Sequence, residues 1–302
     1  MTHDRPRPFG RLLTAMVTPF TRDGALDLDG AQQLASYLVD EQRSDALVIS
    51  GTTGESPTTT DAEKENLLRA VVEAVGDRAR VVAGVGTYST VHTVELARSA
   101  EKAGAHGLLV VTPFYNKPPQ AGLLAHFGTV ADATRLPILV YDIPHRTGTP
   151  VHTETMCRIA EHDRIVGVKD AKGDLAATSQ VLRRTDLAYY SGEDAMTLPL
   201  LAIGGVGLVG TSTHLTGAGS AQLIDAYHRG DHDEALRLHQ ALLPLYTGIF
   251  RTQGTILVKA ALRLRGLPAG PVRPPLVDAT EEEIAQLGKD CRDAGIDLRG
   301  AP

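Results

Sequence analysis

The 302-residue sequence is poor in several kinds of residue, and each shortage excludes a class of protein. It has no tryptophan and two cysteines, Cys157 and Cys291, which lie far apart and belong to no CxxC or Cys/His motif. A disulfide framework and a zinc site are therefore not expected, and a reducing compartment suits the chain best. With 30 Lys and Arg against 36 Asp and Glu, it also lacks the basic patch that nucleic acid binding requires.

Long apolar runs are missing as well. No stretch approaches the roughly 18 residues that a membrane span needs. Residues 1–11 are polar and contain proline, unlike a secretion signal. We therefore expect a soluble, cytoplasmic protein with neither a membrane nor a nucleic acid partner.

What the sequence does have is a regular series of short apolar, β-branched runs. Eight can be recognised: Leu12–Thr18, Ala46–Ser50, Val81–Val85, Leu108–Thr112, Ile138–Tyr141, Ile165–Val168, Leu187–Tyr190 and Val206–Val209. They are continuously apolar rather than alternating, which is typical of parallel strands covered on both faces.

A stretch with apolar residues at helical spacing follows each run. These stretches are Asp29–Glu41, Asp61–Val75, Val91–Ala103, Ala121–Ala133, Thr153–Ile159, Ala176–Arg183, Met196–Ile203 and Gly219–His228. Eight strand-then-helix units predict an α/β fold, the closed (β/α)8 TIM barrel. An open doubly wound sheet is the alternative, but no GxGxxG opens a helix after the first strand.

Beyond residue 228 no further strand is predicted. Three helical stretches remain, Asp233–Phe250, Thr255–Leu264 and Glu281–Ala294. We expect residues 10–228 to form the barrel that carries the active site, and residues 229–302 to form a C-terminal helical appendage packed on it. His228 and His232 have the spacing of two metal ligands on one helix, but Gly230 between them indicates a helix end, so no metal site is expected.

Active sites of such barrels lie at the C-terminal ends of the strands, so polar residues there are the first candidates. Lys169 directly follows the apolar residues 165–168. Its ammonium would emerge from a buried strand, where desolvation favours the neutral amine. A neutral lysine is a nucleophile that forms Schiff bases with carbonyl substrates. The alternative is a structural ion pair with Asp170 or another carboxylate.

Two more strand ends carry polar groups. Thr52 and Thr53 lie between glycines after the second strand, where hydroxyls and exposed amides can hold a small carboxylate; an ordinary loop is the alternative. Tyr141 ends the fifth strand and Arg146 follows shortly after. A tyrosine can transfer protons and an arginine can bind a carboxylate with two parallel hydrogen bonds, although a half-buried aromatic beside a surface arginine would give the same pattern.

These motifs together resemble the dihydrodipicolinate synthase / N-acetylneuraminate lyase family. Thr52 and Thr53 between glycines, Tyr141 with a proline and Arg146 after it, and Gly-Val-Lys ending in Lys169 occur in the family's order. The resemblance extends from about Gly10 to the C-terminal helices.

The resemblance implies a role for each of these residues. Lys169 would form the Schiff base with pyruvate. Tyr141 would be the general acid and base, connected through Thr52 to Tyr115 in a proton relay. Tyr115 would cross a subunit interface, which implies a homotetramer built as a dimer of dimers. Thr53 would hold the pyruvate carboxylate.

Three further positions match the family's substrate contacts. Val209 would contribute its backbone near the imine, and Gly192 would lie close by. Arg146 would bind the carboxylate of aspartate 4-semialdehyde, the second substrate. The resemblance thus implies a lyase of diaminopimelate and lysine biosynthesis that makes 4-hydroxy-tetrahydrodipicolinate without a cofactor.

Arg146 and Thr52 favour this biosynthetic branch, because the sialic acid lyases lack the arginine and tend to have serine in place of the threonine. A keto-acid aldolase or dehydratase acting on a sugar acid is the alternative within the family. A barrel that binds a keto acid or a partner protein without turnover is an alternative from another class.

The resemblance also bears on regulation. In feedback-inhibited members a glutamate, an asparagine, histidines and a tyrosine form an interface pocket for lysine. The corresponding places hold His92, Tyr88, Asp61 with Lys64, and Phe114. Because His92 replaces the carboxylate that binds the ammonium of the ligand, we expect lysine to inhibit weakly or not at all.

Overall fold

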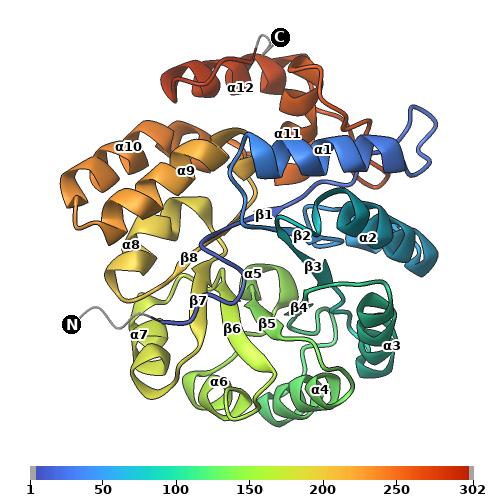
Figure 1. The fold of residues 1–302 in the computed structure, drawn as a ribbon, viewed down its shortest axis with the longest axis vertical. Helices are drawn as coiled ribbons and strands as arrows, with labels where there is room; N and C mark the ends of the chain where they lie inside the picture. Colours follow the sequence, from blue (N-terminus) through green and yellow to red (C-terminus); the bar gives the residue numbers. More distant parts are fainter. Residues whose placement is uncertain (1–4, 299–302) are drawn as a thin grey trace.

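The computed structural model describes residues 5–298, and its centre is a closed barrel of eight parallel strands in sequence order (Figure 1). The strands are β1 Leu12–Ala15, β2 Ala46–Ile49, β3 Arg80–Gly84, β4 Gly107–Val111, β5 Ile138–Asp142, β6 Ile165–Asp170, β7 Ala188–Ser191 and β8 Gly207–Gly210. The barrel closes where β8 pairs with β1, Val209 opposite Leu13. The predicted (β/α)8 fold with C-terminal helices is confirmed.

Helices surround the strands on all sides. They are α1 Leu28–Asp40, α2 Asp61–Val75, α3 Thr90–Lys102, α4 Gln120–Asp132, α5 Pro144–Thr147, α6 Thr153–Ile159, α7 Leu175–Arg184, α8 Thr197–Ala202 and α9 Thr213–His228, with the short 3-10 helices η1 Ser56–Thr58 and η2 Asp194–Met196. Among residues 5–298, no helix is long and apolar enough to cross a membrane.

Two local departures from the predicted elements bear on the site. Helix α9 begins at Thr213 rather than Gly219. Its first two turns contain threonines and glycines, which have low helix propensity, but the buried Asp194 carboxylate accepts the Ser212 backbone N–H at 2.9 Å. Helix α5 was not predicted. Its proline suits the first helical position and Gly148 ends it with φ of 76°.

The core has two layers. Side chains such as Phe9, Leu13, Leu139 and Tyr190 fill the inside of the barrel. A larger apolar cluster lies between the strands and the surrounding helices. Because each strand is covered on both faces, its continuous apolar sequence is explained.

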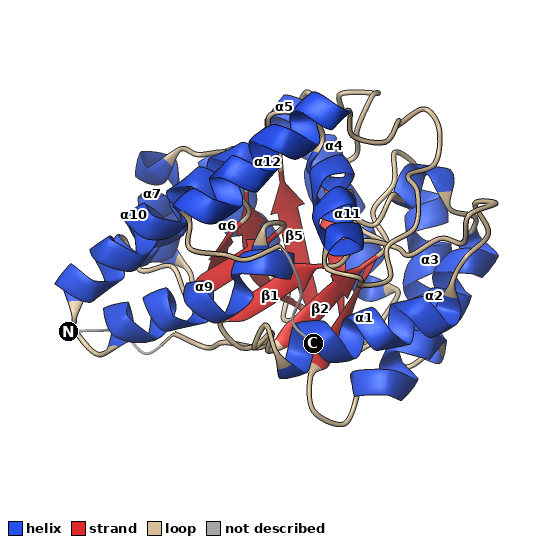
Figure 2. Cartoon of the chain, turned by 90° about the horizontal axis from the view of Figure 1, so that it is seen from above, coloured by secondary structure: helices blue, strands red, loops and turns tan. Residues whose placement is uncertain are grey.

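The chain continues through α10 His232–Gly248, α11 Gly254–Leu264 and α12 Glu281–Asp293. Figure 2 shows α11 and α12 against the barrel. Lys259 of α11 is fully buried, and its Nζ lies 2.6 Å from Oε1 of Glu55 in the loop after β2. We propose the boundary between barrel and appendage at residues 228–229, with the appendage helping to form the rim of the site. Residues 299–302 lie outside the described part.

Candidate active site

A cavity of about 520 Å³ lies at the C-terminal ends of the strands. Its wall comes from five strand ends and from the C-terminal appendage: Thr52 and Thr53 after β2, Ile143, His145 and Arg146 after β5, Lys169 and Ala171 at β6, Gly192, Glu193 and Asp194 after β7, Thr211 after β8, and Tyr246, Thr247, Phe250 and Gln253 among residues 246–255.

Lys169 and Tyr141 form the floor of this cavity. They are register partners on the adjacent strands β6 and β5. Lys169 is 5 % exposed, and its Nζ lies 4.4 Å from the centroid of the Tyr141 ring. The two strands therefore fix an amine beside a phenol ring at the bottom of a polar cavity.

Burial shifts the pKa values of both groups in opposite directions. It lowers the pKa of Lys169 to about 8, helped by the positive charge of Arg146 and opposed by Asp194. The share of neutral amine at pH 7 is then about two orders of magnitude larger than for an ordinary lysine. Burial also raises the pKa of Tyr141, so its phenol keeps its proton at neutral pH.

Asp170 does not serve as the partner of Lys169. Successive residues of a strand point to opposite faces. The Asp170 carboxylate accepts the Thr178 hydroxyl at 2.5 Å and the Lys172 backbone N–H at 2.9 Å. The ion pair considered from the sequence is thus absent from this strand end.

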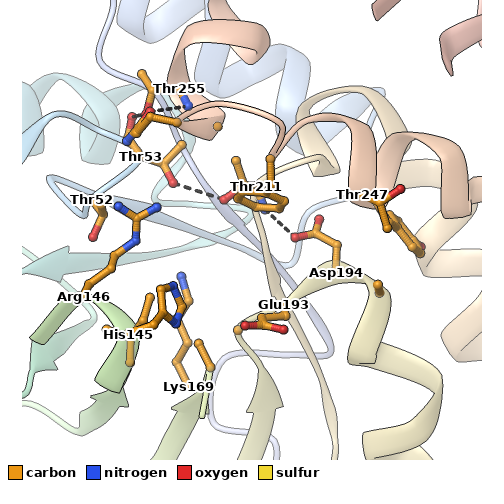
Figure 3. Close-up of a pocket in the computed structure, with 18 of the residues that line it drawn as sticks. Thr52, Thr53, His145, Arg146, Lys169, Glu193, Asp194, Thr211, Thr247 and Thr255 are labelled. Carbon is orange, nitrogen blue, oxygen red and sulfur yellow. Dashed lines mark hydrogen bonds between the residues drawn. The ribbon is translucent and has the colours of Figure 1, made fainter. Parts of the chain in front are cut away.

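A chain of hydrogen bonds runs along the opposite wall (Figure 3). The hydroxyls of Thr53 and Thr211 lie 3.1 Å apart, and the Thr211 backbone N–H donates to Asp194 at 3.3 Å. The Thr255 hydroxyl donates to the Thr53 carbonyl at 2.9 Å. Asp194 is 1 % exposed, and burial raises the pKa of its carboxyl. These contacts fix the Thr53 hydroxyl at the cavity wall.

Arg146 reaches the cavity from α5, next to His145, and its side chain stays exposed. Gly192 follows β7, and its backbone N–H donates to the Asp170 carbonyl at 2.6 Å. A Cβ there would lie 2.9 Å from that of Ala171, so the close approach requires glycine. Val209 is fully buried within β8 and does not line the cavity.

Tyr115, like Val209, is a predicted site residue that does not line the cavity. Its side chain is 92 % exposed, on the loop after β4. A second cavity of about 200 Å³ lies on this side of the barrel mouth and shares Thr52, Tyr141 and Arg146 with the first. Phe114 lines it.

Sequence reasoning missed several residues of the site. Asp194 and Thr211 lie within four residues of predicted strand ends, which are the expected places for site residues. Nothing in the sequence marked Phe250 and Gln253 as site residues, because they belong to the C-terminal segment that was predicted only to pack on the barrel.

A (β/α)8 barrel with a buried lysine beside a tyrosine at its mouth defines a class of barrel enzymes suited to imine chemistry. Residues 8–294 match the model of the dihydrodipicolinate synthetase family. The chain belongs to this family.

Individual relatives agree over nearly the full length. The chain is 72 % identical to the 4-hydroxy-tetrahydrodipicolinate synthase of Acidothermus cellulolyticus, covering 97 % of this chain and 94 % of that one. It is 60 % identical to 4-hydroxy-tetrahydrodipicolinate synthase 2 of Streptomyces coelicolor, covering 96 % and 97 %. The crystal structure of the DHDPS of Cyanidioschyzon merolae with lysine bound matches with a TM-score of 0.94 and 42 % identity, covering 96 % and 99 %.

Proposed function

We propose that this chain is a lyase that condenses pyruvate with L-aspartate 4-semialdehyde to give 4-hydroxy-tetrahydrodipicolinate, the compound for which its relatives are named. The observation that carries the proposal is the buried Lys169, held beside Tyr141 and facing a cavity that also contains Arg146. This product belongs to diaminopimelate and lysine biosynthesis.

The neutral amine of Lys169 attacks the keto carbon of pyruvate, and loss of water gives an imine. A proton leaves the methyl group, and the resulting enamine carbon attacks the aldehyde carbon of the second substrate. The amino group of that substrate then attacks the imine carbon. Its new C–N bond closes the ring as the bond to Lys169 breaks, which regenerates the free amine.

Each step needs a proton at a defined place. Tyr141 holds its proton at neutral pH, and the lysine nitrogen lies 4.4 Å from the centroid of its ring, so we assign its phenol as the acid for loss of water. Thr52 lines both cavities, and we assign it the transfer of protons onward to Tyr115 of the partner subunit. Thr53 donates to the pyruvate carboxylate, and Gly192 shapes the cavity around the imine.

Arg146 binds the carboxylate of the second substrate. Its guanidinium is the cation at the open side of the cavity, and a bidentate pair with a carboxylate also fixes orientation. A neutral sugar tail would leave this cation without a partner, which favours the semialdehyde over sugar acids.

The assembly is a homo-oligomer, a tetramer made of two dimers, in which Tyr115 completes the neighbouring site. Tyr88, Val91 and Tyr115 are 58 %, 70 % and 92 % exposed, and Tyr88 packs edge-on against Phe114 at 5.6 Å. Tyr115 also adopts φ of 72°, an unfavourable conformation for a non-glycine residue that persists only when surrounding structure enforces it. A second subunit on this aromatic patch provides that structure.

Trapping the imine tests the chemistry. Incubation with pyruvate and borohydride should add a reduced pyruvyl group to Lys169 and block tryptic cleavage there, which joins residues 165–169 to 170–172. Labelling should increase from pH 6 and level off above pH 8, because the neutral amine forms as the pH passes the Lys169 pKa of about 8.

Lys172 is the internal control, because its modification would instead join residues 170–172 to 173–183. Absence of label, or label on that second peptide, contradicts the proposed mechanism. Turnover with aspartate semialdehyde, compared with cleavage of sugar keto acids, then distinguishes the branches of the family.

A further inference from the structure

A second polar cluster lies behind the floor of the site, on the outer faces of the same two strands. Asp142 follows Tyr141, and Asp170 follows Lys169, so each carboxylate points away from the barrel interior. They are register partners and are 2 % and 8 % exposed. Buried carboxylates are retained only with partners, and the partners here differ.

Asp170 has a local structural role. It accepts the Thr178 hydroxyl of α7 at 2.5 Å and the Lys172 backbone N–H at 2.9 Å. These bonds fix the turn after β6. They also place the Lys172 side chain over the end of β5.

Asp142 and Lys172 bind the two backbone polar groups of one residue, Val151. The Val151 N–H lies 3.2 Å and 3.3 Å from the two Asp142 carboxylate oxygens. The Lys172 ammonium donates to the Val151 carbonyl at 3.3 Å and lies 3.8 Å from Oδ2 of Asp142. Val151 itself is fully buried. The three residues form a closed ring of polar contacts.

This ring joins the two ends of the segment that carries Arg146. Asp142 is the last residue of β5, and Val151 comes directly after residues 143–150, which include α5. We propose that Asp142 and Lys172 are positioning residues that clamp this segment and so hold the Arg146 guanidinium in place for the second substrate. The inference rests on the proposed function, because it assigns Arg146 to that substrate.

The clamp makes the positioning dependent on pH. The titratable groups that face Asp142 are Lys172, Asp170 and, on β7, the buried Tyr189. Burial raises the pKa of Asp142 to about 7, with Lys172 opposing and Asp170 adding to the rise. Its carboxylate therefore forms as the pH rises through 7. The ion pair with Lys172 is present above this pH and lost below it.

Steady-state kinetics of Asp142→Asn test the proposal. Asparagine still accepts the Val151 N–H but carries no charge for Lys172. At pH 8 we expect kcat/KM for aspartate semialdehyde to fall by roughly tenfold or more, since a misplacement of about 1 Å can cost a hundredfold. The loss should disappear at pH 6, where Asp142 is itself neutral. KM for pyruvate and the yield of imine trapping should stay within about twofold of the values for the unmodified enzyme. This limit is well below the loss expected in kcat/KM for the semialdehyde.

A second variant keeps the test valid if Asp142→Asn folds poorly. Lys172→Gln retains a donor for the Val151 carbonyl and should show the same selective loss. In the double variant two neutral amides can pair, so its loss should be smaller than the sum of the two single losses. Glu154→Gln, an exposed carboxylate on α6 paired with Arg184, is the matched control and should change nothing.

Three outcomes overturn the clamp. One is an equal loss with both substrates, which indicates a general structural role. Another is a loss that does not depend on pH. The third is unchanged kinetics with the semialdehyde in both single variants. Failure of imine trapping in the unmodified enzyme would instead contradict the proposed function.

Discussion

The cavity floor and the loop after β4 are built in opposite ways. Lys169 and Tyr141 are both buried, are fixed by strand register, and have pKa values shifted by their surroundings. Tyr115 is 92 % exposed on a loop. The chemistry of imine formation is thus complete within one chain, whereas the outer end of the proton relay is not.

The difference shows which functions a barrel can provide alone. A strand end fixes a side chain through its hydrogen-bonded neighbours and core packing, so desolvation at Lys169 needs no partner subunit. A loop that leaves the barrel has no such support. Under the proposed assembly Tyr115 depends on a second subunit, so breaking the assembly should affect the relay while sparing the imine.

The largest effect is expected for substitution of Arg146, which lines both the main cavity and the cavity on the side of the loop after β4. Arg146→Ala should still trap pyruvate on Lys169, yet lose roughly ten- to a hundredfold in kcat/KM for the semialdehyde, because a charged hydrogen bond contributes about 1.5–3 kcal/mol. Arg146→Lys should recover only part of this loss, since an ammonium lacks the planar pair of donors. Borohydride trapping and initial rates measure the two steps separately.

Arg69→Ala is the control, because this exposed arginine of α2 pairs with Glu65 far from the cavity. If Arg146→Ala reduced trapping and condensation equally, Arg146 would be a structural residue rather than a substrate contact.

The sequence predicted the fold and the cavity floor better than the cavity walls. Continuous apolar runs mark covered strands, so all eight were recognised, and a lysine that ends such a run is conspicuous. Asp194 could have been found, because it lies in the same turn as Gly192. Gln253 could not, since its place at the rim depends on how the C-terminal helices pack.

Contacts between distant residues also explain why some helix boundaries differ from the predicted ones. Helix α9 begins at Thr213, where the carboxylate of Asp194, 19 residues earlier, accepts the Ser212 N–H and so supports the first turn. Such long-range contacts cannot be read from local propensity. The role of Tyr115 remains a prediction for a related reason, since the partners proposed for its hydroxyl belong to a second subunit.

A smaller effect is expected at Tyr115 itself. Tyr115→Phe keeps the ring that packs at the interface and removes the relay hydroxyl. We expect kcat to fall by up to roughly tenfold, less than the hundredfold or more that a positioned acid–base group contributes, because Tyr141 remains. Imine trapping and the sedimentation coefficient should be unchanged. Tyr88→Phe, in the same aromatic patch, is the matched control.

Analytical ultracentrifugation addresses the assembly directly. A monomer with full activity would contradict the shared site. If the protein is oligomeric but Tyr115→Phe has a normal kcat, the interface is supported and a proton relay through Tyr115 is excluded.

The smallest effect should be that of free lysine, and the structure gives the reason. At the places that match the inhibitor pocket, Nε2 of His92 lies 2.8 Å from the Asp61 carboxylate. The Lys64 ammonium lies 3.8 Å from Asp61 and donates to the Thr59 carbonyl at 2.5 Å. The acidic group is therefore already paired within the chain, and a second ammonium would meet Lys64 there.

Losing one charged hydrogen bond costs a ligand roughly 1.5–3 kcal/mol, which is more than tenfold in affinity. Initial rates with millimolar lysine should therefore stay close to those without it. In the variant His92→Glu the ligand would regain a carboxylate, so lysine should inhibit more strongly there than in the unmodified enzyme. Half-inhibition of the unmodified enzyme below about 1 mM, equivalent to a binding free energy near −4 kcal/mol, would show that other residues complete the pocket.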